Sequence, residues 1–297
     1  MVVVLWASFP ALIKLALLDF PPFVFAFLRC ACAAIFLVVS FARAGEEASR
    51  GLTPASLTPF LVLGVVGIFV STQLSYVAIY YSTASNALIL QAATPVVVTV
   101  GAWLYLGESM RRTQWLGAAA SILGVLVVIT HGRLTALRPD EIHLGDLINV
   151  VGVLGWSAYT VYGRRVLASH SPAVATTAAY LVGTTLMIPV AILSLPYFPM
   201  PRFRSSFAWG VVVYQAVLGA IAHVWWYRAV AVVGPSRTAI FLNVQPVLGL
   251  VFASTVLGER IGIAQVVGAA CVIGGVALTT RARREPRAGD PRQETTR

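Results

Sequence analysis

Apolar residues in this chain run in long stretches that are separated by short polar breaks. A helix needs about 20 mostly apolar residues to cross a bilayer. Ten stretches approach that length: 2–18, 23–42, 57–79, 85–105, 113–130, 145–163, 172–194, 207–227, 237–257 and 262–280. The breaks hold Gly, Pro and nearly all of the charged residues, as turns do. The pattern predicts an all-α integral membrane protein with ten transmembrane helices.

The first stretch, 2–18, is expected to be a spanning helix and not a cleaved signal. It has no basic region before it and no small-residue cleavage site after it, and Lys14 interrupts its end. Because the chain opens directly on this stretch, we expect that a few natural residues are missing ahead of it.

Composition supports a membrane location and argues against nucleic acid as a partner. The 297 residues are 58% hydrophobic and 11% charged, whereas soluble domains carry about 25% charged residues. The formal net charge of +10 could indicate nucleic-acid binding, but six of the 21 basic residues lie in the tail 281–297, and no basic stripe is interleaved with aromatic residues. We therefore expect the lipid bilayer as a partner and no nucleic acid.

The distribution of basic residues predicts the orientation. With ten helices both termini lie on one side, and placing them inside puts 14 basic residues in the cytoplasm and five outside. We expect a multi-pass protein of the cell inner (plasma) membrane with both termini cytoplasmic. The loop 131–144 is then external, and 281–297 is a cytoplasmic basic tail.

The two halves of the chain resemble each other. When the sequence is shifted by 151, residues 76–124 lie over 227–275 without a gap. Pro95 then meets Pro246, and Glu108 meets Glu259. Five helices per half is an odd number, so the second copy has the opposite orientation in the membrane. Two inverted five-helix repeats, 1–130 and 145–280, around a central cavity are typical of secondary transporters with a site near the membrane midplane.

The same residues resemble a known family. The run Tyr81-Ser82-Thr83-Ala84-Ser85, then Pro95, Leu106-Gly107-Glu108 and Gly117, is similar to the EamA repeat of the drug/metabolite transporter superfamily, as is the opening with Leu5-Trp6, Lys14 and Leu28-Arg29. The second half repeats the pattern at Pro246, Gly258-Glu259 and Gly268. The resemblance implies a ten-helix exporter with a central cavity and cytoplasmic termini. Overall similarity places the chain nearest the amino-acid exporter branch.

Equivalent positions of inverted repeats should line one cavity, and this predicts the substrate site. In the stretch 207–227, His223, Trp226 and Tyr227 share one helix face. Their partners in the first half are Thr72, Ser75 and Tyr76. A shift of 150 likewise places Trp6 over Trp156 and Phe9 over Tyr159. The candidates are Trp6, Thr72, Ser75, Tyr76, Gln91, Thr94, Trp156, Tyr159, His223, Trp226, Tyr227 and Gln245, with Phe9 and the weaker Asn243 beside them. The alternatives are that the aromatic residues only pack or lie at membrane interfaces, and that His223 is a neutral imidazole bonded to a nearby carbonyl or hydroxyl.

Several other polar or breaking residues each allow two interpretations. Pro95 and Pro246 are expected to kink the middle of their helices and to act as hinges, although membrane helices also tolerate proline without motion. Small residues at 117–124 and 268–275 permit close helix packing, within the protein or between protomers of a homodimer. Glu108 and Glu259 are expected to cap helices or pair with Arg111, Arg112 or Arg260. Lys14 and Arg29 are expected to snorkel near outer helix ends, with Asp19 as a partner, or else to form an anion-attracting vestibule.

The expected cavity is aromatic, polar and almost uncharged, which suits neutral or zwitterionic solutes such as amino acids, aromatic ones included. Phosphorylated substrates would require Lys14 and Arg29 to turn inward. With no carboxylate expected in mid-membrane, facilitated export by alternating access is favoured. The alternative is a proton-coupled drug/metabolite antiporter that uses His223.

A channel and a membrane enzyme are the competing classes. The sequence contains neither HExxH nor GxSxG, its four His residues are scattered, and Cys30, Cys32 and Cys271 lie in apolar stretches without metal-ligand spacing. We expect no enzyme activity, no metal and no cofactor. The expected partners are a small-molecule substrate and the bilayer, with the protein a monomer or homodimer.

Overall fold

The computed structural model describes residues 2–43, 57–132, 143–239, 241–242 and 245–281, and every regular element in these ranges is helical. The helices of the first half are α1 (Val2–Ala16), α2 (Pro22–Arg43), α3 (Leu57–Leu63), η3 (Gly64–Thr72), α4 (Gln73–Tyr81), α5 (Ala84–Gln91), α6 (Thr94–Leu106) and α7 (Arg112–Ile129). Those of the second half are α8 (Leu144–Val166), α9 (Pro172–Ser194), η5 (Leu195–Tyr197), α10 (Ser206–Val233), α11 (Pro235–Ala239), α12 (Gln245–Leu257) and α13 (Ile263–Arg281).

Seven helical segments in the described part of the chain are long and apolar enough to cross a membrane. Three further apolar helices, Val2–Ala16, Gln245–Leu257 and Ile263–Thr279, are shorter than a full span. The protein is therefore an all-helical, multi-pass membrane protein. That it has ten transmembrane helices stays a prediction. The external linker falls largely, and the basic tail almost wholly, outside the described residues.

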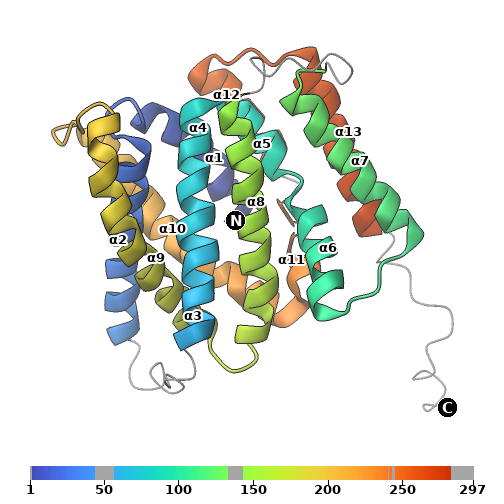
Figure 1. Ribbon diagram of the computed structural model, residues 1–297, viewed down its shortest axis with the longest axis horizontal. Helices are drawn as coiled ribbons and strands as arrows, with labels where there is room; N and C mark the ends of the chain where they lie inside the picture. Colours follow the sequence, from blue (N-terminus) through green and yellow to red (C-terminus); the bar gives the residue numbers. More distant parts are fainter. Residues whose placement is uncertain (1, 44–56, 133–142, 240, 243–244, 282–297) are drawn as a thin grey trace.

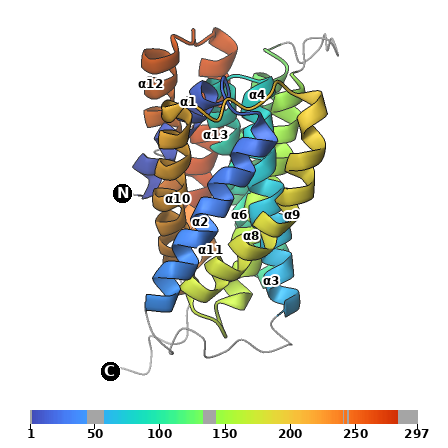
Figure 2. The same cartoon turned by 90° about the vertical axis from the view of Figure 1, so that its left-hand side faces the viewer.

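The helices form a bundle in which α4 and α8 lie side by side, nearest the viewer in Figure 1. Helices α2, α9 and α10 pack together on one side, while α7 and α13 lie side by side on the other. Figure 2, turned by 90°, shows α2, α9 and α10 running between the two ends of the bundle. The central space is bordered by α1, α4, α8 and α10, and all four helices contribute residues to the main hydrophobic cluster.

The small residues at 117–124 and 268–275 bring α7 and α13 into contact within the chain. A Cβ atom added to Gly117 would lie 2.4 Å from the carbonyl oxygen of Gly275, and one added to Gly124 would lie 2.6 Å from that of Gly268. Two helix backbones can come this close only where the residues between them have no side chain. Of the two roles considered for these stretches, the structure shows packing inside the protein.

The expected single helix 57–79 contains a π-helical segment, η3, and extends to Tyr81. Hydrogen bonds of the i→i+5 type are rare and are found mostly at functional sites. Gly67 in this segment lies against the ring of Tyr159, where an added Cβ would be 2.1 Å from Cδ2. The π segment places Ser71 and Thr72 at its end, beside the central space.

Pro95 and Pro246 lie at the starts of α6 and α12 and not inside continuous helices, so the kinks expected in mid-helix are helix starts instead. The span 84–106 is broken at Ala92–Ala93, and Pro95 lies in the first turn of α6. Proline has no N–H to donate to the carbonyl of Gln91, and the hydroxyl of Thr94 donates to that oxygen instead, at 2.5 Å. Pro246 is the second residue of α12. Both prolines start the second part of a broken span.

Candidate functional site

A cavity of about 140 Å³ lies in the middle of the bundle. Its walls come from α1, α2, η3, α4, α5, α6, α8, α10 and α12 and from the 3-10 turn at Leu242, so both halves of the chain contribute. Nine of the twelve predicted site residues line it: Trp6, Thr72, Ser75, Tyr76, Gln91, Thr94, Trp156, His223 and Gln245. The weaker candidate Asn243 lies outside the described residues.

Three rings form one wall of the cavity. The ring centroids of Trp6 and Trp156 are 5.4 Å apart with the planes perpendicular, and His223 lies 5.7 Å from Trp6 and 5.2 Å from Trp156. Edge-to-face contacts of this kind are favourable for aromatic rings. Because α1, α8 and α10 each supply one ring, the wall depends on how these three helices pack.

His223 is held by its own helix. Its Nδ1 lies 2.7 Å from the carbonyl oxygen of Gly219 and 3.3 Å from the hydroxyl of Tyr180. A carbonyl oxygen only accepts, so Nδ1 carries the proton in this contact. This matches the alternative in which His223 is bonded to a nearby carbonyl, yet the residue also lines the cavity. His223 is therefore both bonded to a backbone carbonyl and part of the cavity wall.

Other residues that line the cavity are polar and uncharged. The Tyr76 hydroxyl donates to Oε1 of Gln215 at 2.6 Å. Ser75 donates to the carbonyl of Ser71 at 2.8 Å, which leaves the hydroxyl oxygen able to accept. Across the cavity, Nε2 of Gln245 lies 3.4 Å from Oε1 of Gln91, joining α12 to α5.

Tyr159, Trp226 and Tyr227 do not line this cavity. The rings of Tyr159 and Tyr227 are stacked with centroids 4.6 Å apart, and the Tyr227 hydroxyl donates to the carbonyl of Tyr159. Trp226 packs behind Trp6 and donates to Thr160 Oγ1 at 3.2 Å. Tyr159 also borders a second, almost wholly apolar pocket between α3, α6 and α8. These three residues support the cavity wall from behind.

The sequence reasoning missed Arg29 as a cavity residue. It is expected to snorkel at an outer helix end or to form an outer vestibule with Lys14, but it is 3% exposed and lines the central cavity. The lining is therefore not wholly uncharged, because among its residues Arg29 contributes a guanidinium. A signal was available: Arg29 lies two turns inside the apolar stretch 23–42, and a charged residue at that depth usually marks a functional site.

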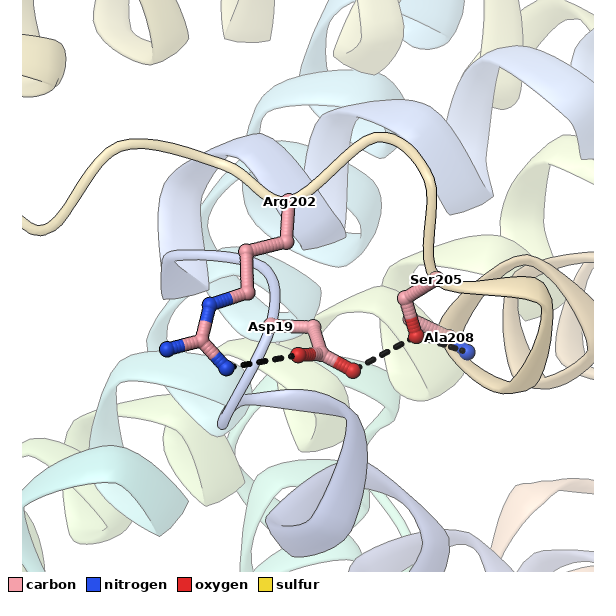
Figure 3. A network of polar contacts seen from close by, with 4 residues as sticks. All are labelled: Asp19, Arg202, Ser205 and Ala208. Carbon is pink, nitrogen blue, oxygen red and sulfur yellow. Dashed lines mark hydrogen bonds and ion pairs between the residues drawn. The ribbon is translucent and has the colours of Figure 1, made fainter.

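Lys14 and Asp19 also have other partners than expected. The ammonium of Lys14 donates to the carbonyls of Ile79 and Ser82, at 2.8 and 2.5 Å, where α4 ends. Figure 3 shows Asp19 between Arg202, at 3.5 Å, and Ser205, at 2.6 Å. Lys14 thus satisfies carbonyls that a helix end leaves unpaired, and Asp19 ties the α1–α2 turn to the start of α10.

Glu259 and Glu108 contact the starts of short helices, as the capping interpretation expected. The carboxylate of Glu259 accepts hydrogen bonds from the backbone N–H groups of Ala84 and Ser85, both at 2.9 Å. Glu108 accepts from Ser236 Oγ at 3.0 Å, in the first turn of α11. A carboxylate at a helix start satisfies N–H groups that the helix leaves unpaired. Each glutamate therefore joins the end of one broken span to the start of the other.

Asp146, in the first turn of α8, is a buried carboxylate that the sequence reasoning did not single out. It accepts hydrogen bonds from Ser82 Oγ and from Asn86 Nδ2, the latter at 2.9 Å. It does not line the cavity. Among the described residues, no group of three His, Cys, Asp or Glu side chains is placed to hold a metal ion.

Comparison with known proteins agrees with this architecture. The model of the EamA-like transporter family matches residues 1–130 and 143–281. An uncharacterised transporter of Bacillus subtilis, YyaM, is 28% identical over 86% of this chain and 83% of its own length. One of Archaeoglobus fulgidus is 29% identical over 93% of both chains, and the uncharacterised inner membrane transporter YedA of Escherichia coli is 23% identical over 93% of this chain and 87% of its own.

One solved crystal structure superposes with a TM-score of 0.68 at 19% identity and covers 96% of both chains, which establishes the shared fold. The family and the curated relatives point to a transporter and not to an enzyme. Since the family model matches almost the whole chain, this protein belongs to the EamA-like transporter family.

Proposed function

We propose that this protein is a secondary transporter that exports small neutral or zwitterionic metabolites, above all amino acids, including aromatic ones. The observation that carries the proposal is the central cavity, whose walls come from both halves of the chain. Its volume of about 140 Å³ is below the roughly 300–1,000 Å³ of pockets for drug-sized ligands. The size favours metabolites over larger drugs.

The chemistry of the walls suits an amino acid with an apolar side chain. Trp6 and Trp156 offer ring surfaces against which an aliphatic or aromatic group can pack. The hydroxyls of Ser75 and Tyr76 and the amide of Gln91 offer hydrogen bonds to the polar end. Transport of such a substrate requires only binding and release, without a covalent step.

Alternating access of two inverted repeats, 1–130 and 145–280, is the mechanism we favour. The broken spans α5–α6 and α11–α12 meet at the cavity through Gln91 and Gln245, and the Glu259 and Glu108 contacts join their outer parts. Pro95 and Pro246, at the starts of α6 and α12, are the candidate hinges. We place the protein in the inner membrane with both termini cytoplasmic, as a monomer or homodimer.

The proposal is tested with purified full-length protein in proteoliposomes, measuring uptake of labelled phenylalanine, leucine and alanine with and without a pH gradient. A facilitative carrier gives saturable uptake and counterflow that are independent of the pH gradient. Flux that does not saturate would indicate a channel. Lack of flux for every amino acid would refute amino acids as the substrate class.

The alternative is a proton-coupled drug/metabolite antiporter that uses His223. It is favoured by one observation, the position of this imidazole in the cavity wall between Trp6 and Trp156. In the same assay an antiporter gives uptake that rises with the imposed pH gradient and collapses when a protonophore removes the gradient.

A further inference from the structure

Arg29 is a buried cation for which the described part of the chain supplies no anion. Its side chain is 3% exposed. Its polar contact is a weak one, from Nη1 to the sulfur of Cys30 at 3.6 Å, and its Nε has no hydrogen-bond partner. The ring of Tyr180 lies 5.5 Å from the guanidinium carbon. No carboxylate among the described residues pairs with it.

Such an arrangement is costly unless a ligand completes it. Burying a charge away from water without a partner is strongly unfavourable, and buried charges in proteins are normally paired. The thiol of Cys30 and the ring and hydroxyl of Tyr180 offer partial compensation only, because neither side chain is an anion. The guanidinium therefore has N–H groups that can still donate hydrogen bonds to an anionic oxygen.

The side chain of Arg29 lies where an anion in the cavity could reach it. Arg29 lines the central cavity, as do Phe9, Tyr76 and His223. Its Nη2 reaches α10 at Gly219, where an added Cβ would lie only 2.5 Å from that nitrogen. The glycine leaves the space that the guanidinium occupies.

The chemistry favours a carboxylate over a phosphate. An arginine presents parallel N–H groups that match a carboxylate in a bidentate manner. A phosphate group, with a charge close to −2, would call for a second cation. Lys14 is engaged with the carbonyls of Ile79 and Ser82, so it is not placed to serve as one.

We propose that Arg29 binds the carboxylate of the transported substrate, which makes the cavity selective for small organic acids and zwitterions that carry one carboxylate beside an apolar group. This inference rests on the proposed transport function and deepens it. It predicts the order of affinities at this site: an acid binds more tightly than its amide, which has almost the same shape but no carboxylate. A wall built only for neutral solutes would not make this distinction.

The test is calorimetric binding to the purified full-length protein in detergent, using phenylalanine, phenylalaninamide and 3-phenylpropionate as probes. The wild type should bind phenylalanine about 10- to 100-fold more tightly than its amide, as expected for a hydrogen-bonded charge pair. Arg29→Gln should reduce this ratio to within about threefold. Arg29→Lys should fall between, because it keeps the charge but loses the bidentate geometry.

Two further variants separate recognition from structure. Gly219→Ala keeps the guanidinium but displaces it, so it should also lower the ratio of acid to amide affinity. This variant replaces Arg29→Gln in the test if Arg29→Gln does not fold. Arg202→Gln is the matched control, since this arginine is exposed, with 75% of its side-chain surface accessible, and lies away from the cavity. It should leave the ratio at the wild-type value.

The outcomes separate this inference from the proposed function. Equal wild-type affinity for acid and amide, or a ratio unchanged in Arg29→Gln, would overturn the role of Arg29, while saturable amino-acid flux would still stand. Binding of 3-phenylpropionate that depends on Arg29, without amino-acid flux, would support the carboxylate site and refute the amino-acid proposal. Binding of neither acid would overturn the inference.

Discussion

Two equivalent faces of the molecule, one in each half, have different surroundings. On η3 and α4, Thr72, Ser75 and Tyr76 all line the cavity, whereas on α10 only His223 of the corresponding three residues does so. The counterparts Trp226 and Tyr227 are packed behind the wall. The related sequences therefore do not have equivalent environments in this structure.

The difference arises from what each face packs against. Phe9 and Tyr76 both border the cavity, while the residues related to them, Tyr159 and Tyr227, are stacked on each other with an interplanar angle of 19°. The stack is possible because Gly163 leaves room for the Tyr227 ring, whose hydroxyl would be 2.5 Å from an added Cβ. Phe9 and Tyr76 thus border the cavity, whereas Tyr159 and Tyr227 are packed against each other.

The largest effect is expected from removing the two tyrosine side chains. Tyr227→Ala should lower the free energy of unfolding by about 3–5 kcal/mol, because it leaves a large cavity in a packed stack. Tyr76→Ala should cost less than half as much, since one side of its ring already borders the cavity, but it should reduce flux at least tenfold. Thermal unfolding of the purified variants and proteoliposome uptake measure the two quantities. Equal stability losses would show that the two faces are equally packed.

A finer distinction comes from removing the hydroxyl groups alone. Tyr76→Phe loses the bond to Gln215 at the cavity wall and should reduce flux about fivefold, the worth of about one neutral hydrogen bond. Tyr227→Phe loses the bond to the Tyr159 carbonyl and should lower stability by about 1 kcal/mol while flux stays within about twofold. A reversed pattern, with flux lost in Tyr227→Phe, would place the substrate on the α10 face.

The smallest effects are expected at the two prolines. Pro95→Ala and Pro246→Ala each restore an N–H at the start of a half-helix, which should join the broken spans more firmly and slow turnover by about two- to fivefold. Substrate affinity should change by less than about twofold, because neither proline lines the cavity. Counterflow rates and calorimetric affinities together test this. Wild-type turnover in both variants would exclude a hinge role.

Much of the candidate site could be predicted from the sequence, because it follows from a repeat. Trp6 and Trp156, or Thr94 and Gln245, occupy related positions in the two halves, and the structure brings all four to one cavity. The prediction was less accurate for the aromatic residues of α10. A helix face indicates which residues point the same way, but the neighbour opposite decides whether they meet space or another ring.

The apolar stretches and their polar breaks by themselves determined the helical membrane architecture, because lipid requires helices of a certain length and apolar composition. The internal repeat indicated nine of the residues that line the cavity. Tertiary structure alone decided that Arg29 turns inward without an anionic partner in the described part of the chain, that Lys14 is engaged by helix carbonyls, and that Tyr227 is closed off by Tyr159. The physical reason is that a side chain's environment depends on helices distant in the sequence, and local pattern carries no information about which of them packs against it.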